Sequence, residues 1–386
     1  DILDSIAYEK GLKIDDVENA LKEALIKTAQ KMVDETLTFD ANIDRANKKL
    51  ELFQKIEVVS EDDERLNANA VNKYGEAINY ENFITLEEAK EIDPDLEIGD
   101  FMNYDLEFEN MGRNAATILH SNFEYRLQRF IEENLVSKYK DKVGKTIAGT
   151  VTRIDRQENT FIEIGEVKGI LQRKSRIKGE TFKVGDVVKA VVKGVNIDKI
   201  NGLLIDISRT SPKFLENLLV LEVPELKDKK VTIEASARIP GTRSKIALST
   251  IDAQIDPIGS VVGVKGVRIG SVSKQLNGEN IDCVEFSTIP EMFISRALSP
   301  ALVNSVKIEK HPSYGEKGKA IVTIPSDQKS KAIGKAGLNI RLASMLTKYD
   351  IELIEIASTT PSANNEKAVV NEEKTTDTAS LEALFK

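Results

Sequence analysis

The chain has 386 residues, which is enough for two to four domains. Its single cysteine and two histidines exclude a disulfide framework and a cysteine/histidine zinc cluster. No apolar run reaches the roughly 18 residues of a membrane-spanning helix, and no signal-peptide pattern occurs. We therefore expect a cytoplasmic protein that makes no contact with membranes and has neither a metal nor another cofactor.

The net charge of −9 is unevenly distributed along the chain. Residues 1–140 carry 32 acidic and 17 basic side chains, whereas residues 141–357 carry 26 acidic and 34 basic ones. This asymmetry predicts two kinds of partner, a basic or neutral surface for the first part and a polyanion for the second.

The first 139 residues have the pattern of an α+β domain. Asp15 is placed to cap a first helix, with Glu18 three residues later as in a capping box. In residues 49–59 apolar and polar side chains alternate imperfectly, which predicts a strand with one solvent-exposed face. Thr85 begins a second capping box, which predicts the start of a short helix. A long helix with one apolar side is predicted from residue 112 to about residue 139.

Residues 142–210 predict five short strands in a small closed barrel. Their spacing resembles the OB-fold RNA-binding domain first named in ribosomal protein S-one. Phe161 is the candidate for stacking on bases, and burial of this ring is the alternative. Arg153, Lys189 and Arg209 are the candidates for phosphate contacts.

A glycine turn is the most informative motif of the remaining chain. Gly263-Val264-Lys265-Gly266 lies between two predicted short helices and is followed closely by Arg268. Glycines permit unusual backbone angles and let another backbone approach closely, which suits a sugar-phosphate strand at helix N-termini. A helix-turn-helix packed on itself also requires such a turn, so one copy alone leaves both interpretations open.

A second copy of this turn, Gly334-Lys335-Ala336-Gly337, follows 71 positions later and has Arg341 in its following helix. Each copy leads into an apolar strand, so the chain contains a repeat of domain size. The two units, residues 211–288 and 289–357, resemble tandem type II KH domains, whose Gly-x-x-Gly loop binds about four nucleotides of single-stranded nucleic acid. All eight loop residues and Arg268 and Arg341 are therefore candidate RNA-binding residues, although Arg341 alternatively contacts the neighbours of its own helix.

A cationic joint precedes the first glycine turn. Arg243 and Lys245 follow a Pro-Gly turn that Arg238 precedes. Two interpretations remain open, a ledge for phosphate groups and a solubilising hairpin.

Residues 358–386 are rich in Ser, Thr, Asn and Glu, and we expect a disordered, flexible tail. Residues 378–386 form either a frayed end or a short amphipathic helix.

Several strings resemble the bacterial transcription elongation factor family NusA over residues 1 to about 357. They are Ile84-Thr85-Leu86-Glu87-Glu88-Ala89-Lys90-Glu91-Ile92-Asp93-Pro94-Asp95, Gly112-Arg113-Asn114-Ala115-Ala116, Leu221-Glu222-Val223-Pro224-Glu225, Ile255-Asp256-Pro257-Ile258-Gly259 and Ile340-Arg341-Leu342-Ala343-Ser344. The acidic C-terminal repeats of some relatives are missing, so the regulation that depends on them is in doubt here.

The resemblance implies a monomeric factor that binds core RNA polymerase near the flap of its β subunit and receives nascent single-stranded RNA. Such factors alter pausing, intrinsic termination and antitermination, and other Nus factors are further candidate partners. Arg113, at the start of the long helix, is implied at the polymerase, with a structural role at the helix start as the alternative.

An enzyme is disfavoured because no Walker loop, metal cluster or catalytic triad occurs in the sequence. The alternative function is a polymerase-independent single-stranded RNA-binding or ribosome-associated factor, and the acidic first domain distinguishes the two.

Overall fold

The computed structural model describes residues 2–198, 200–357 and 375–377. It divides into two compact units, Asp1–Lys138 and Tyr139–Lys386. Among the described residues, no helix is both long and apolar enough to cross a membrane.

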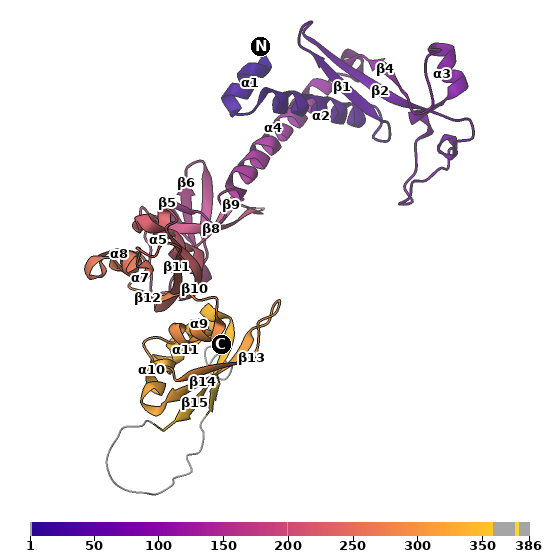
Figure 1. The fold of residues 1–386 in the computed structure, drawn as a ribbon. Helices are drawn as coiled ribbons and strands as arrows, with labels where there is room; N and C mark the ends of the chain where they lie inside the picture. Colours follow the sequence, from indigo (N-terminus) through magenta and orange to yellow (C-terminus); the bar gives the residue numbers. More distant parts are fainter. Residues whose placement is uncertain (1, 199, 358–374, 378–386) are drawn as a thin grey trace, which may run out of the picture. The chain divides into compact units, whose positions relative to one another are not determined.

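In the first unit, helices pack against one face of a four-stranded sheet (Figure 1). The central strand β2 pairs with β4 along one edge and, along the other, with β1 beside its first half and β3 beside its last residues. Leu21 and Leu25 of α2 join Phe39, Ala41 and Leu52 of the sheet in one core. The elements are α1 (Ile2–Lys10), α2 (Ile14–Met32), β1 (Phe39–Asp44), β2 (Lys49–Val59), β3 (Phe83–Thr85), α3 (Leu86–Ile92), β4 (Phe101–Leu106) and α4 (Ala115–Lys140).

The helix starts of this unit were only partly predicted. Thr85 caps α3 as expected, because its hydroxyl oxygen accepts a hydrogen bond from the backbone N–H of Glu88 at 3.3 Å. The cap assigned to Asp15 is wrong. The cap lies two residues earlier: Lys13 is the N-cap and makes no side-chain bond, and the helix begins at Ile14. Asp15 lies in the first turn, where its charge is stabilised by the helix dipole. Helix α1 was not predicted at all.

Residues 146–208 form a closed five-stranded barrel, as expected. The strand order is β5-β6-β7-β9-β8, with β8 pairing back onto β5. Two positions need glycine because the barrel interior is crowded: a Cβ at Gly149 would lie 2.7 Å from the carbonyl oxygen of Glu163, and one at Gly169 would lie 2.6 Å from Ile164 Cδ1. The strands are β5 (Thr146–Ile154), β6 (Thr160–Ile164), β7 (Val167–Leu171), β8 (Val187–Asp198) and β9 (Gly202–Ser208).

The rest of the second unit consists of two copies of one topology, which we call the first repeat (residues 211–288) and the second repeat (residues 289–357). Each copy has an antiparallel strand pair, then a helix-turn-helix, then a third strand parallel to the middle one. The helix pair packs on one face of its sheet (Figure 1).

The elements of the first repeat are α5 (Pro212–Glu222), α6 (Pro224–Lys227), β10 (Val231–Ile239), β11 (Arg243–Thr250), α7 (Pro257–Val262), α8 (Val267–Gln275) and β12 (Asn280–Glu285). Those of the second are α9 (Pro290–Ala297), β13 (Ser305–Lys310), β14 (Gly318–Pro325), α10 (Lys329–Ile333), α11 (Leu338–Thr347) and β15 (Tyr349–Ile356).

The predicted tail lies outside the described residues except for residues 375–377. These form a short strand, β16 (Thr375–Asp377), which pairs antiparallel with β15. This strand was not predicted.

Candidate nucleic-acid interface

The two Gly-x-x-Gly loops have the same backbone conformation. The first glycines, Gly263 and Gly334, have φ/ψ of 76°/171° and 74°/174°. The last glycines are both left-handed, and each donates a hydrogen bond back to the first, at 3.1 and 3.2 Å. Both loops open onto a helix N-terminus, where backbone N–H groups and the helix dipole favour a phosphate.

Each loop also holds a residue other than glycine in the left-handed region. Lys265 has φ 53° and ψ 25°, and Ala336 has φ 54° and ψ 28°. This conformation costs about 1–2 kcal/mol per residue. The same strained backbone is therefore formed twice, by different residues at equivalent positions.

Different side chains pack against the first glycine of the two loops. A Cβ at Gly263 would lie 2.8 Å from Arg268 Cγ, and one at Gly334 would lie 2.7 Å from Asn339 Cβ. Arg268 donates to a Glu225 carboxylate oxygen at 2.8 Å and to the Ser260 carbonyl oxygen at 2.6 Å. Arg268 therefore packs against the loop and stabilises it. Its charge is already paired with Glu225.

Asn339 supports the second loop. It is 4 % exposed, and its amide nitrogen donates to the carbonyl oxygens of Leu298, Lys331 and Ala332. The sequence prediction missed this residue, although the 71-residue offset between the loops aligns it with Arg268. The same offset aligns Arg341 with Gly270, so the two arginines predicted as RNA contacts are not equivalent.

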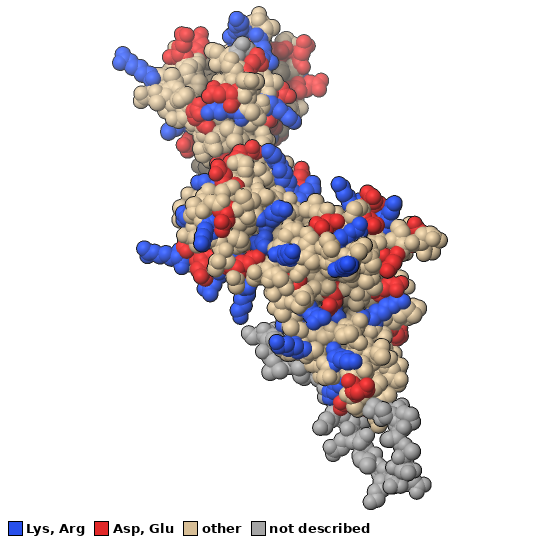
Figure 2. Space-filling model, turned by 90° about the vertical axis from the view of Figure 1, so that its left-hand side faces the viewer, with Lys and Arg blue, Asp and Glu red and all other residues tan. Residues whose placement is uncertain are grey.

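Each loop carries one lysine that is free to meet a phosphate. Lys265 and Lys335 are exposed, and neither makes an ion pair within the described part of the chain. Lys331, which was not predicted, is exposed beside the second loop in the same way. Val264, in the first loop, is 83 % exposed. Figure 2 shows lysine and arginine side chains spread over the visible surface, with carboxylates between them.

One hydrophobic cluster spans both repeats, although the helices of the first repeat also pack in a cluster of their own. Ala237, Ala247 and Val284 of the first repeat pack in the same cluster as the buried side chains of the second. Lys245 of β11 adds a polar link, because its Nζ donates to the Ser299 carbonyl oxygen at 2.9 Å. The two loops are therefore carried by one continuous body.

This arrangement corrects the predicted phosphate ledge. Lys245 is fully buried and also lies 3.7 Å from an Asp282 carboxylate oxygen. Arg243 forms a two-point ion pair with the same carboxylate, at 2.6 and 2.9 Å. Arg238 is paired with Glu279 in the interior. These three cations therefore form ion pairs within the fold. Lys245 in particular is buried and cannot contact a phosphate group of a bound RNA.

Arg209 is also a structural residue. It is 8 % exposed, and its guanidinium binds the Glu180 carboxylate through two nitrogens and the Gln275 carbonyl oxygen at 2.8 Å. Gln275 belongs to α8, so this arginine joins the barrel to the first repeat. Contrary to the prediction, its guanidinium is therefore not available to a phosphate group.

Phe161 is buried, the alternative that the sequence left open. It is 8 % exposed, and the Arg153 guanidinium lies over the ring at 3.9 Å from its centroid. The exposed surface of this pair is therefore the guanidinium plane.

In the first unit, Arg113 is exposed just before α4 and makes no hydrogen bond or ion pair with the described residues. This leaves its guanidinium available to a partner and gives no support to a structural role at the helix start.

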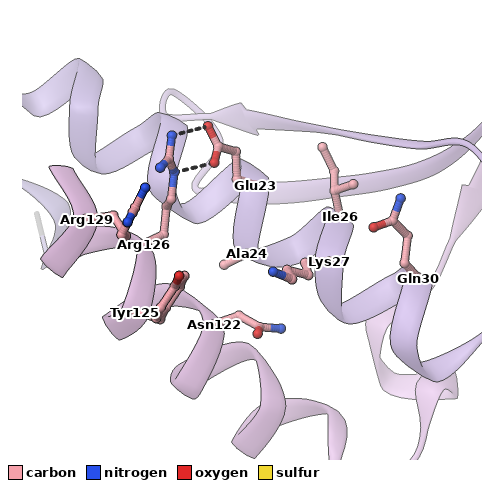
Figure 3. A pocket seen from close by; sticks show the side chains of 9 residues that line it. All are labelled: Glu23, Ala24, Ile26, Lys27, Gln30, Asn122, Tyr125, Arg126 and Arg129. Carbon is pink, nitrogen blue, oxygen red and sulfur yellow. Dashed lines mark hydrogen bonds and ion pairs between the residues drawn. The ribbon is translucent and has the colours of Figure 1, made fainter. Parts of the chain in front are cut away.

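A groove lies between α2 and α4 of the first unit (Figure 3). Arg126 pairs with Glu23 across it and lies over the Phe130 ring, while Tyr125 is 61 % exposed. Arg129 and Lys27 add two further cations to the lining of this otherwise acidic unit.

Comparison with known proteins decides the family. A NusA protein of Helicobacter pylori (strain J99), named as a transcription termination/antitermination protein, is 42 % identical over an alignment that covers all of this chain and 98 % of the relative. The chain belongs to the NusA family. The NusA protein of Thermus thermophilus is 34 % identical over 99 % of this chain and 96 % of its own length, and that of Bacillus subtilis is 30 % identical over 92 % and 89 %.

Three family models locate the NusA parts along the chain. The NusA N-terminal domain matches residues 1–130, the NusA-like first KH domain matches residues 209–286, and the NusA-like second KH domain matches residues 290–361. The two repeats with their Gly-x-x-Gly loops are thus NusA-like KH domains, as the repeated motif predicted.

Proposed function

We propose that this chain is a non-enzymatic transcription termination/antitermination factor of the cytoplasm. Its second unit binds nascent single-stranded RNA, and its first unit binds RNA polymerase. The observation that carries the RNA-binding part is the pair of identically folded Gly-x-x-Gly loops on one shared core, with exposed Lys265 and Lys335. A loop of this shape binds a sugar-phosphate backbone, so sequence preference there is modest and salt dependence strong.

Residues 142–210, 211–288 and 289–357 are the three proposed RNA-binding domains. Because they are joined by Arg209 and by the shared core, binding at one domain raises the effective concentration of RNA at the next. Modest individual contacts therefore suffice for a stable complex.

For the polymerase, the proposed contact is the region around Arg113 in the first unit, facing the β-subunit flap. The acidic charge of residues 1–140 supports this division, because an acidic surface repels RNA and is suited to a protein partner. Other Nus factors remain candidates for surfaces that these two ligands leave free. The protein acts as a monomer in this proposal.

The RNA part is tested with the double variant Lys265→Asp/Lys335→Asp in the full chain. Fluorescence anisotropy with single-stranded RNA should show a loss of affinity of at least about tenfold and a shallower salt dependence. The matched control is Lys229→Asp/Lys348→Asp, which changes the same charge at two exposed lysines of the two repeats, away from the loops. Equal losses in both double variants would remove the loops as the binding site.

The polymerase part is tested with Arg113→Glu and a photo-crosslinking residue at the same position. Core polymerase should retain the Lys265→Asp/Lys335→Asp variant and lose most of the Arg113→Glu variant, and the crosslink should form to the β subunit. If the full chain binds RNA but core polymerase never retains it, the polymerase-independent RNA-binding factor becomes the better description.

A further inference from the structure

The sheet of the second repeat has an edge that the chain's own tail partly covers. Its strand order is β13-β14-β15-β16, so β15 would be the outermost strand without β16. Residues 375–377 pair antiparallel with Glu352, Leu353 and Ile354, which are three of the eight residues of β15. An uncovered edge strand presents backbone N–H and C=O groups to any partner that can hydrogen-bond with them. The tail strand therefore occupies backbone groups that are suited to another ligand.

This edge lies on the same side of the repeat as the Gly-x-x-Gly loop. Helix α9 packs on β13, at the opposite edge of the sheet, whereas α11 packs on β15 and α10 packs on α11 (Figure 1). Helix α10 leads directly into the loop and is linked to β15 by an ion pair between Lys329 and Glu355 at 3.3 Å. The five residues of α10 span only about 7.5 Å. The loop therefore begins close to the part of β15 that β16 covers.

A single RNA strand bound at this loop would reach the edge of β15. The loop binds the sugar-phosphate backbone, and the bases of a single strand are left to hydrogen-bond through their edges. The backbone N–H and C=O groups of an edge strand are matching partners for such base edges. RNA and β16 therefore compete for one row of backbone groups.

The contact between β16 and β15 is weak enough for a ligand to displace it. It involves only three residue pairs, and a short pair of strands is marginally stable by itself in water. Its register places Asp377 opposite Glu352, and like charges at directly opposite positions destabilise a strand pair. Lys319 Nζ lies 3.4 Å from a Glu352 carboxylate oxygen and relieves part of this repulsion.

We propose that residues 375–377 are an internal competitor of RNA at the second repeat. While they cover the edge of β15, RNA bound at residues 334–337 has no access to the covered backbone groups. When RNA occupies that edge, the strand is released. The effect is reciprocal, so a partner that binds the released strand raises the affinity for RNA by the same factor by which RNA raises the affinity for that partner. The inference rests on the proposed RNA-binding function and adds a regulation of it.

The first test measures RNA affinity of full-chain variants by fluorescence anisotropy with single-stranded RNA. Thr376→Pro cannot maintain the strand pair and should bind RNA about threefold to tenfold more tightly than wild type. Ala368→Pro is the matched control, because it places a proline in the same tail outside β16, and it should leave the affinity unchanged. In a Lys335→Asp background, which weakens the loop of this repeat, Thr376→Pro should give no gain. A gain that persists there would overturn the inference.

Asp377→Lys separates competition from general electrostatics. It places a lysine opposite Glu352, so β16 should pair more strongly and RNA should bind about threefold more weakly, although the protein gains positive charge. Glu372→Lys makes the same change of charge outside β16, and it should bind RNA as tightly as wild type or more tightly. If Asp377→Lys binds RNA more tightly as well, the strand does not compete with RNA.

Amide hydrogen exchange measures the release of the strand directly. Saturating RNA should slow exchange in residues 334–337 and accelerate it in residues 375–377. Slower or unchanged exchange in residues 375–377, or equal RNA affinities of Thr376→Pro and Ala368→Pro, overturns this inference alone. Absence of RNA binding in wild type and in every variant overturns the proposed function as well.

Discussion

Arg268 and Asn339 occupy equivalent positions of the two repeats, 71 residues apart, and each lies directly beneath the first glycine of its loop. Arg268 fills the space with a side chain whose guanidinium is paired with Glu225. Asn339 fills it with a buried amide that donates to three carbonyl oxygens. Two chemically different supports thus produce one loop geometry.

Gly263→Ala should destabilise the second unit by about 1–3 kcal/mol, because φ is positive there and a Cβ would press on Arg268. Gly270→Ala is the control from the neighbouring helix, where a Cβ meets nothing within 4 Å. It should stabilise α8 by about 1 kcal/mol. Thermal unfolding measures both, and a harmless Gly263→Ala would show that the loop does not need its present shape.

Asn339→Ala should cost about 2–3 kcal/mol, since three carbonyl oxygens lose their donor in a buried place. Asn339→Asp keeps the shape but supplies no N–H donor, so it should be at least as damaging. Denaturant unfolding gives the stability, and RNA affinity at a temperature where both variants are folded gives the effect on the loop. If the aspartate variant matches wild type, the amide bonds contribute nothing to the loop.

The buried amino group of Lys245 should make the stability of the protein depend on pH. Burial lowers the pKa of this lysine from 10.5 to about 8, with Asp282 opposing the shift and Arg243 adding to it. Between about pH 8 and 10.5 the unfolded chain therefore binds more protons than the native one, and this group makes stability rise with pH across that window.

Lys245→Met should remove this rise and increase stability at pH 7 by about 1–3 kcal/mol, because it replaces a buried charge by an apolar chain of similar length. Melting temperatures of both proteins from pH 7 to 10 provide the measurement. Parallel curves for the two proteins would show that another group causes the dependence.

Arg209→Ala should cost about 3–5 kcal/mol, because it leaves the Glu180 carboxylate buried without its counterion. Arg209→Lys should rescue little, since a single ammonium cannot reproduce the two-point contact with Glu180 and the bond to Gln275. Limited proteolysis between the barrel and the first repeat reports the loss of the link. A double variant Arg209→Ala/Glu180→Ala should recover part of the stability, and if it recovers none, the ion pair is not the cause.

The sequence predicted what depends on short-range pattern. The barrel, the repeated helix-turn-helix and the Thr85 cap each follow from residues close together in the chain. It could not predict which cations are used inside the fold. Arg209 meets Glu180 and Gln275, and Lys245 meets Ser299, only after distant segments have packed together. Asn339 is different, because aligning the two loops would have identified it.

Because one hydrophobic cluster joins the two repeats, the described residues hold their loops at one separation. An RNA that engages both must therefore contain at least enough nucleotides between the two bound segments to span this distance, whatever their sequence. The protein would thereby impose a lower limit on the spacing of its two RNA segments, and a transcript whose intervening stretch is too short would occupy only one loop at a time.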